Sequence, residues 1–336
     1  MYTERAEKAG NMEELEQIKQ PIATELAAYR KLFEQTLKQD NPLLQLALDH
    51  LLQRQGKMMR PILTLLAARC AGKVNDAVLN AAVSLELLHT ASLVHDDVVD
   101  SSDRRRGQKS VNALLDNRAA VLVGDYLLSK ALSHAAATGS NRVVAWVAEL
   151  GQTLSDGELL QLANLDKTDI SEEDYYEVIQ KKTASLFETC AKAGALLGGG
   201  QTADVEWLTN FGQGIGNCFQ LRDDLLDYGS PTDTGKPTGN DMKEGKLTLP
   251  VIHALLTTAN TAMHDIAIRV RRGEATDEEI TCLVSFTHKQ GGLEYAEKKL
   301  DEMGNFCIKL LHGKQGNASI LNALSHYVHF VIGREN

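Results

Sequence analysis

Two clusters of aspartates repeat one spacing in this sequence. They read Asp96-Asp97-Val-Val-Asp100 and Asp223-Asp224-Leu-Leu-Asp227. In each cluster the first and last aspartates are four residues apart. On a helix their carboxylates therefore share one face, about 6 Å apart along the axis. Neither first aspartate has a Lys or Arg four residues away: Asp96 has Ser92 and Asp100, and Asp223 has Phe219 and Asp227.

This arrangement is unfavourable unless something binds it. Like charges four residues apart cost about 0.2–0.5 kcal/mol per pair. Carboxylates at a helix C-terminus also oppose the helix dipole, at about 0.3–1 kcal/mol each. A solvated acidic helix end would be the plain alternative, but such ends normally include Lys or Arg partners. A hard oxygen-binding cation would offset the repulsion, and Mg²⁺ is commonly held by one or two carboxylates together with substrate phosphates.

Basic residues accompany the two aspartate clusters along the chain. Arginine forks match the oxygens of a diphosphate, and lysines act as mobile point charges. Each such residue alone is more often a surface cation, and a lone histidine is more often a satisfied core residue. No G-x-x-x-x-G-K-[ST] phosphate loop is present, so metal-assisted departure of a diphosphate fits better than phosphoryl transfer. The candidate cations are Lys57, Arg60, His89, Arg104, Arg105, Arg106, Lys182, Lys236 and Lys246.

Helical periodicity extends over almost the whole chain and predicts an all-α fold. Apolar residues recur at three- and four-residue spacings. Asn41-Pro42, Asn75 and Ser171 are typical helix starts. Both aspartate clusters are predicted to end helices. No strand pattern or repeat is evident. Helices are expected from 75 to 100, from 117 to about 139, from 171 to the glycine run at 198–200, and at about 203–227, 248–272, 277–289, 292–312 and 317–332.

One glycine- and proline-rich stretch, 228–246, interrupts the helices and is expected to be a functional loop. No change in composition marks a second domain. We therefore expect residues 1–336 to form a single domain, with helices at about 12–39 serving dimerisation or packing.

Charge and composition exclude several classes of function. The 336 residues carry 35 Lys and Arg against 45 Asp and Glu, a net charge of −10. This balance argues against a general nucleic-acid binder. No apolar run is long enough for a transmembrane segment, and the N-terminal residues resemble no targeting signal. The five cysteines form no C-x-x-C pair, which is typical of reduced thiols in a cytoplasmic protein.

The combined motifs resemble the trans-type polyprenyl diphosphate synthases over roughly residues 40–330. The resemblance rests on GKMMRP, HTASLVHDDVVDSSDRRRG, KKTASLF, CFQLRDDLLD and GKPTGNDMKEGKLTLP, in the order of the family. It is strongest to medium- and long-chain members. It implies an antiparallel helical bundle around a deep central cavity, with the aspartate clusters facing each other at its mouth. The reaction would join isopentenyl diphosphate to an allylic diphosphate of the farnesyl or geranyl type.

The resemblance also implies roles for individual residues. Mg²⁺, expected as three ions with diphosphate bound, would be held by Asp96, Asp100 and Asp223. Asp97 and Asp227 would assist from behind these ligands, and Asp224 completes the catalytic set. The allylic diphosphate would be held by Arg105, Lys182 and Lys236, and Lys246 is a further substrate-binding candidate. The isopentenyl diphosphate pocket would comprise Lys57, Arg60, His89 and Arg106. Thr183 and Gln220 would lie near the reacting carbons.

Two positions depart from the family pattern. Met58 stands where members often have arginine, and Arg104 is an additional cation without an assigned role. Product length would be set by Leu88, Ala91 and Ser92, which precede Asp96 by eight, five and four residues. Because Ala91 and Ser92 are small, we expect growth beyond fifteen or twenty carbons, to a floor deeper in the cavity, around Tyr126–Leu132. Homodimerisation is expected from the resemblance.

Three alternatives remain to be compared with this interpretation. A class I terpene synthase also uses one D-D-x-x-D motif, but it needs no isopentenyl site and so would not require Lys57, Arg60 and His89. A non-catalytic subunit of a heteromeric synthase typically loses aspartates from one cluster, whereas both clusters are intact here. An acidic helical scaffold would not explain the unpaired aspartates.

Overall fold

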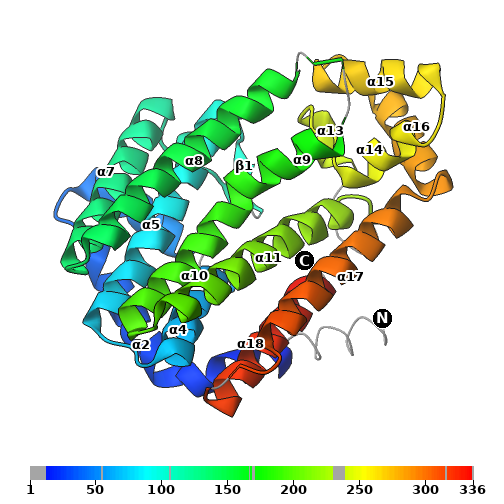
Figure 1. Cartoon of the computed structure of the whole chain (residues 1–336). Coiled ribbons are helices and arrows are strands. Elements are labelled where there is room, and N and C mark those ends of the chain that lie inside the picture. The colour runs from blue at the N-terminus through cyan, green and yellow to red at the C-terminus, as the bar shows by residue number, and fades with distance from the viewer. Residues whose placement is uncertain are drawn as a thin grey trace.

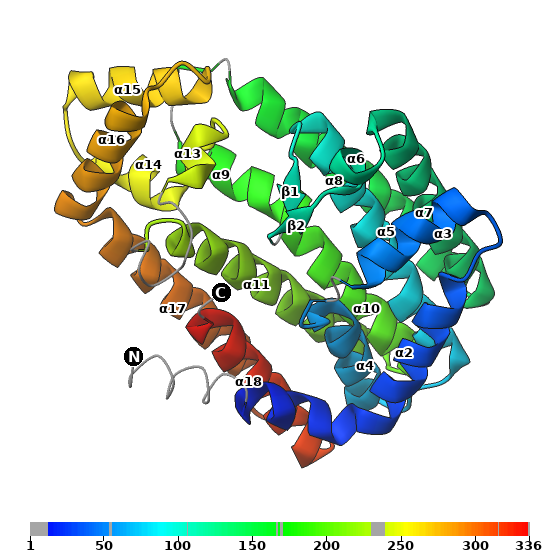
Figure 2. The same ribbon diagram turned by 180° about the vertical axis from the view of Figure 1, so that it is seen from behind.

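Helices make up most of the described chain in this computed structural model (Figures 1 and 2). The structure describes residues 13–53, 56–105, 107–165, 167–168, 171–229, 239–314 and 316–334. The first half comprises η1 (Gln20–Ile22), α2 (Ala23–Thr36), α3 (Pro42–Leu52), α4 (Met59–Ala71), α5 (Asp76–Val99), β1 (Arg104–Arg105), β2 (Gln108–Lys109), α6 (Val111–Leu114), α7 (Asn117–Ala137) and α8 (Asn141–Leu165). The second half comprises α9 (Glu172–Ile179), η2 (Gln180–Ala184), α10 (Ser185–Gly198), α11 (Thr202–Leu226), α13 (Asn240–Lys243), α14 (Leu249–Leu256), α15 (Thr261–Arg271), α16 (Asp277–Lys289), α17 (Gly292–Leu311) and α18 (Ala318–Gly333).

The helix α5 lies at the centre of the N-terminal half and packs against α2, α4, α7, α8 and α10. Its start is held by Asn75, whose Oδ1 accepts a hydrogen bond from the Val78 amide at 3.0 Å. By length and composition it could cross a membrane, but 56% of its most apolar window is buried within the protein. A buried position among other helices explains this apolar sequence. The helix thus carries the first aspartate cluster on a rigid support.

The helix α11 carries the second cluster and packs between α10 and α17 (Figure 1). Glycines allow the close approach to α10 and η2. A Cβ added at Gly216 would lie 2.4 Å from the Ala184 Cα, and one at Gly212 would lie 2.6 Å from the Phe187 carbonyl oxygen. Such distances are shorter than real Cβ contacts, so only glycine fits at either position. Gln220 and Asp224 are thereby held next to η2.

Between α9 and α10 the helix widens into a π-helical turn, η2. Such turns are frequent at functional sites, because they displace side chains from the regular helical positions. Here η2 contains Lys182 and Thr183. The predicted helix start is correct: the Ser171 Oγ accepts a hydrogen bond from the Asp174 amide at 3.1 Å. The Asp174 carboxylate forms an ion pair with the Lys167 ammonium at 2.7 Å.

Three sequence-based expectations need correction. The helix expected at 248–272 is two helices, α14 and α15, separated by a turn whose Asn260 side chain caps the second. The stretch 228–246 contains a short helix, α13, among its described residues. A two-residue antiparallel hairpin, β1–β2, follows α5 where no strand was expected (Figure 2). Its turn includes Gly107, with φ of 76°, a conformation that favours glycine.

Residues 23–36 of the expected N-terminal helical region pack into the core. Leu26, Tyr29 and Phe33 are buried, and α2 contacts α4 and α5. This segment therefore has a packing role within the chain. Any contribution to dimerisation stays a prediction.

Candidate active site

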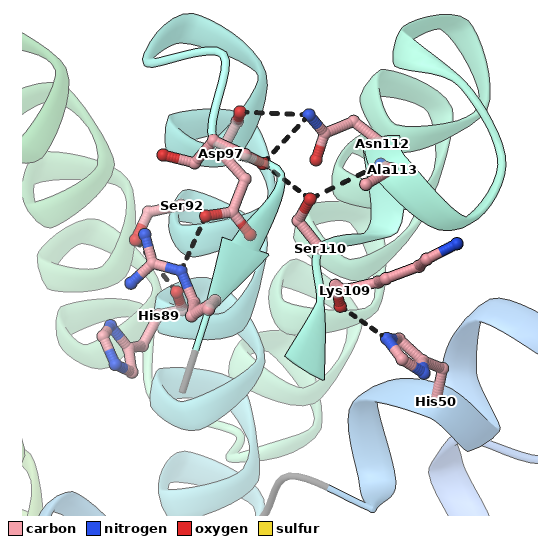
Figure 3. Close-up of polar contacts among 10 residues, drawn as sticks. His50, His89, Ser92, Asp97, Lys109, Ser110, Asn112 and Ala113 are labelled. Carbon is pink, nitrogen blue, oxygen red and sulfur yellow. Dashed lines mark hydrogen bonds and ion pairs between the residues drawn. The ribbon is translucent and has the colours of Figure 1, made fainter. Parts of the chain in front are cut away.

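The first aspartate cluster lies at the C-terminal end of α5, as expected. Asp97 is buried, and its Oδ1 accepts a hydrogen bond from the Arg105 Nε at 2.7 Å. Its backbone carbonyl accepts a hydrogen bond from the Asn112 side chain at 3.2 Å (Figure 3). Arg105, which was predicted to hold the allylic diphosphate, thus has a carboxylate partner. The ion pair holds the β1–β2 hairpin beside the cluster.

Asp96 is half-buried, whereas Asp100 is exposed. Burial above all, together with Glu158 and Asp100, raises the pKa of Asp96, whereas Lys182 and Arg105 lower it; the net result is a pKa of about 6. An ionised Asp96 is therefore poorly solvated by its surroundings. A divalent cation bound here would relieve that cost.

The second cluster is organised by a chain of side-chain hydrogen bonds. The Thr183 hydroxyl donates to the Gln220 Oε1 at 2.7 Å, and the Gln220 Nε2 donates to the Asp224 Oδ1 at 2.8 Å. The Tyr175 hydroxyl donates to the other oxygen, Oδ2, of Asp224 at 2.6 Å. Burial raises the pKa of Asp224 above its ordinary value, although these two hydrogen bonds lower it. The chain connects α9, η2 and α11 around one carboxylate.

Asp227 directly follows the last residue of α11 and anchors the segment that begins at residue 239. Its two carboxylate oxygens accept hydrogen bonds from the amides of Asn240 and Asp241, each at 3.1 Å. Burial raises the pKa values of both Asp227 and Asp241, and Asp224 adds to the effect at Asp241. The four described groups Asp223, Asp224, Asp227 and Asp241 therefore concentrate negative charge at this end of α11.

Two lysines connect the clusters electrostatically. Lys182 bonds Glu158 at 2.7 Å and Gln161 at 2.9 Å, and it lowers the pKa of Asp96. Burial lowers the pKa of Lys246, but Glu244, Asp241 and Asp100 outweigh this and raise it overall. Lys246 thus interacts with a residue of the first cluster and with Asp241 beside the second.

A cavity of about 230 Å³ opens between η2, α11 and the 241–248 segment. Lys182, Thr183, Gln220, Asp224 and Lys246 all line it. Residues from segments distant in sequence are thus brought to one polar cavity that carries both positive and negative charge. This geometry suits a ligand with an anionic group that is bound jointly by cations and by metal ions.

Two of the residues expected at the isopentenyl diphosphate pocket, Lys57 and Arg60, lie near aromatic rings. The Lys57 ammonium is 5.1 Å from the Phe330 ring centre, and the Arg60 guanidinium is 4.9 Å from that of Phe187 and 5.7 Å from that of Phe219. These are cation–π distances. His89 lies on α5, where its carbonyl accepts a hydrogen bond from the Ser92 hydroxyl at 2.9 Å (Figure 3).

Arg334, which follows α18, connects this region with the second cluster. Its Nη2 bonds the Asp223 Oδ1 at 2.6 Å and the Phe219 carbonyl at 2.7 Å. Its guanidinium also lies 3.7 Å from the Phe219 ring centre. Asp223 therefore has a cationic partner in the folded protein, which its own helix does not supply.

The proposed chain-length residues lie below Asp96 on α5. Leu88 and Ala91 are each 3% exposed, and Ser92 is half-buried. Two other predicted site residues, Arg106 and Lys236, lie outside the described residues.

Four residues of this site were not singled out from the sequence: Glu158, Tyr175, Asp241 and Arg334. Asp241 belongs to the GNDMKEGK motif, so its motif was noticed although its own position was not. Glu158, Tyr175 and Arg334 belong to helix faces or a chain end with no distinctive spacing. Only the packing of α8, α9 and α18 brings them to the clusters.

The donor set fits a metal that takes part of its coordination from substrate. Among the described residues, no three His, Cys, Asp or Glu side chains are grouped closely enough to hold an ion by themselves. Mg²⁺ is usually bound by one or two carboxylates, with phosphate and water oxygens completing the octahedron. Asp96, with a raised pKa, and Asp100 one turn later are suitable protein ligands.

Comparison with known proteins identifies the family of the chain. The Polyprenyl synthetase family model matches residues 41–285. Octaprenyl diphosphate synthase of Escherichia coli is 36% identical over 300 residues, covering 88% of this chain and 92% of that protein. The solved geranylgeranyl pyrophosphate synthase of Bacteroides thetaiotaomicron is 44% identical with a TM-score of 0.85, covering 96% of this chain and all (100%) of that one. The solved decaprenyl diphosphate synthase of Rhodobacter capsulatus is 34% identical with a TM-score of 0.89, at 96% and 100% coverage. The chain therefore belongs to the polyprenyl synthetase family and is a prenyltransferase.

Proposed function

We propose that this enzyme is a Mg²⁺-dependent all-trans polyprenyl diphosphate synthase that adds isopentenyl diphosphate to an allylic diphosphate. The observation that carries the proposal is the joint placement of two aspartate clusters and two lysines. The Lys182 ammonium lowers the pKa of Asp96 in the first cluster, and Lys182 lines the same cavity as Asp224 of the second cluster. The terpene synthase and non-catalytic alternatives would not require two intact clusters together with cations beyond them.

Different residues are proposed to bind the metal ions, to stabilise the leaving diphosphate and to orient other side chains. Asp96, Asp100 and Asp223 would hold three Mg²⁺ ions, and these supply Lewis-acid stabilisation of the charge that develops on the leaving diphosphate. Lys182, Lys246, Arg105 and Lys236 would add electrostatic stabilisation to the same group. Asp97 would orient Arg105 through their ion pair, and Asp227 would orient the 239–241 segment.

The second substrate would be held on the other side of the reacting carbons. Lys57, Arg60, His89 and Arg106 are proposed to bind isopentenyl diphosphate, whose double bond attacks the allylic carbon as its C–O bond breaks. A proton is then lost and the chain is five carbons longer. Thr183 and Gln220, joined by a hydrogen bond, would face the reacting carbons.

We propose a product of medium or long chain length. The small side chains of Ala91 and Ser92 support this, since larger side chains at these two positions would obstruct a growing chain next to Asp96. Relatives carry names that range from geranylgeranyl to decaprenyl synthase, so names alone do not decide the length. Leu88, one further turn along α5, would be the next side chain that the growing product meets.

The test is a product assay with purified protein, Mg²⁺, labelled isopentenyl diphosphate and farnesyl or geranyl diphosphate. We expect a ladder of products longer than twenty carbons, abolished by a chelator. Products that stop at fifteen or twenty carbons would refute the length assignment but not the reaction. No elongation with either primer would refute the proposed activity. In the matched variant Ala91→Phe we expect shorter products, and unchanged products would refute the assignment of Ala91.

We further propose that the chain acts as a cytoplasmic homodimer in which each copy, residues 1–336, forms one catalytic domain. The dimer is supported by an apolar exposed face on α7 and α8. Leu122 is 67% exposed and Leu132 44% on α7, and Leu159 is 64% exposed on α8. Light scattering should give twice the mass of one chain, and Leu122→Glu should reduce it to one. A monomeric wild-type protein would refute the dimer.

A further inference from the structure

A second cavity, of about 400 Å³, lies outside the substrate site between α9, α11 and α17. We call it the α9–α17 pocket and define it by the lining residues Glu172, Tyr176, Asn217, Glu302, Met303 and Phe306, together with Lys299 and the segment 213–214. None of these residues belongs to the motifs that carry the prenyltransferase resemblance. Its size is within the range of small-molecule sites.

The polar groups of this pocket are mainly hydrogen-bond acceptors. Asn217 Oδ1 is buried and has no hydrogen-bond partner among the described residues. Two carboxylates, Glu172 and Glu302, line the same pocket, against one ammonium, that of Lys299, which pairs with Glu302 at 3.3 Å. Glu172 also accepts a hydrogen bond from the Tyr295 hydroxyl at 2.8 Å and lies 3.8 Å from His253 Nδ1. A buried acceptor without a hydrogen bond destabilises the folded protein. A ligand that donates hydrogen bonds and carries positive charge would offset part of that destabilisation.

The rest of the lining is apolar or aromatic. Met303 is half-buried, and Phe306 is 49% exposed although it is a large apolar side chain. Tyr176 is half-buried on the opposite side, on α9. Aromatic faces attract cations within about 6 Å of the ring centre, and the methionine and phenylalanine side chains would cover an apolar body. An anionic ligand would instead face two carboxylates and an amide oxygen, with one ammonium, that of Lys299, already paired with Glu302.

We infer that the α9–α17 pocket binds a small organic cation, a primary ammonium group joined to a short apolar or aromatic body. The Asn217 side chain would rotate to present Oδ1 to the pocket, and the ammonium would lie between this oxygen and the carboxylates of Glu172 and Glu302. The body would lie against Met303 and Phe306.

The pocket shares two helices with the active site. Tyr176 lines the α9–α17 pocket, while its neighbour Tyr175 donates the 2.6 Å hydrogen bond to Asp224. On α11, Asn217 precedes Gln220 by three residues, and Gln220 bonds the same carboxylate. A ligand that repositions α9 or Asn217 therefore changes the environment of Asp224. Ligand binding in the pocket is thus linked to metal and diphosphate binding at the active site, and this link rests on the proposed function.

Isothermal titration calorimetry with phenethylamine tests the binding directly, on the full chain and without substrates. We expect a Kd below about 1 mM, which needs only about −4 kcal/mol from a ligand of about nine non-hydrogen atoms. The neutral analogue 2-phenylethanol and the anionic analogue 3-phenylpropionate should bind at least about tenfold more weakly. Equal binding of the three compounds, or no binding of the amine at 10 mM, would overturn the inference.

Variants separate this pocket from non-specific binding. Asn217→Leu removes the unpartnered acceptor, so it should raise the melting temperature of the free protein and weaken phenethylamine binding at least about tenfold. Asn305→Leu is the matched control, because Asn305 is exposed on α17, and it should change neither. Met303→Trp should fill the pocket and abolish binding while prenyl transfer continues. Retained binding in both pocket variants would place the amine elsewhere and refute the assignment.

The link to the active site has its own measurement. The phenethylamine titration is repeated with Mg²⁺ and inorganic diphosphate, whose own binding is recorded in the same instrument. We expect the Kd of the amine to change at least twofold. An unchanged Kd while diphosphate binds would overturn the link, whereas absence of diphosphate binding would count against the proposed function.

Discussion

Replacing Asp96 by asparagine should stabilise the metal-free protein while it abolishes catalysis. The side chain is half-buried beside Glu158 and Asp100, and burial raises its pKa from 3.8 to about 6. Asparagine has nearly the same shape and no charge. The substitution therefore removes the desolvation and repulsion of the carboxylate together with a proposed Mg²⁺ ligand.

The magnitude follows from the pKa difference. A shift of about two pKa units corresponds to at most about 3 kcal/mol, and solvent screening of a partly exposed group reduces this to about 1–2 kcal/mol. With an unfolding entropy of about 2.1 cal/mol/K per residue, 336 residues give about 0.7 kcal/mol/K. The melting temperature should therefore rise by about 1.5–3 °C.

The effect has a defined pH window. Because the pKa of Asp96 is raised in the folded state, the folded protein binds a proton more readily than the unfolded chain. The ionised carboxylate therefore destabilises the fold fully above about pH 6, and this cost disappears below about pH 4. The advantage of Asp96→Asn should follow the same profile.

The assay is thermal unfolding in EDTA between pH 4 and 8, followed by titration with Mg²⁺ and inorganic diphosphate. Wild-type protein should gain stability from this mixture at pH 7.5, and the variant should gain much less. Asp103→Asn, a change at an exposed aspartate, is the control and should stay within about 0.5 kcal/mol of wild type. A variant that melts at or below the wild-type temperature at pH 7.5 would refute the reasoning.

The same charge interactions predict the direction in which Glu158→Gln shifts the pH dependence of the reaction. Glu158 raises the pKa of Asp96 and bonds Lys182 at 2.7 Å. Its neutralisation should shift the acid limb of the pH–rate profile to lower pH and lower kcat through the released lysine. An acid limb that moves to higher pH would contradict the assignment.

Two further predictions concern hydrogen bonding and helix packing. Tyr175→Phe removes the donor to the buried Asp224, and it should lower the free energy of unfolding by about 1–3 kcal/mol and kcat by tenfold or more; unchanged melting and unchanged kinetics would contradict this. Gly124→Ala places a Cβ 2.1 Å from His95 Nε2, so melting should fall, whereas Gly151→Ala, with nothing within 4 Å, should gain up to about 1 kcal/mol. Equal melting temperatures of the two alanine variants would show that the His95 side chain can move away from a Cβ at position 124 without loss of stability.

Local features of the fold were predictable because they depend on neighbours in sequence. Asn75 and Ser171 cap helices as expected, since a cap needs only an acceptor and the first amides of the helix. The break between α14 and α15 was not predicted. Apolar residues continue the helical pattern up to that turn, and only the Asn260 cap and the packing of two separate helices require the chain to change direction.

The same distinction holds for the site: features of one helix were predictable, and contacts between distant segments were not. Each aspartate cluster, with its four-residue spacing, was evident from sequence because one helix positions it. The environment of each carboxylate was not. Asp223 lacked a partner by sequence but bonds Arg334 from the end of the chain, 111 residues away. Arg105 was expected to hold the allylic diphosphate, and in the structure it pairs with Asp97.

The sequence by itself determined the helical class, the two carboxylate clusters and the set of cations, because periodicity and spacing are local properties. Tertiary structure alone decided which groups share one cavity. The pKa of Asp96 depends on Glu158 of α8, and the hydrogen bonding of Asp224 depends on Tyr175 of α9. Desolvation and charge–charge interactions depend on distance in space, and helices far apart in sequence reach that distance only when their apolar faces are buried together.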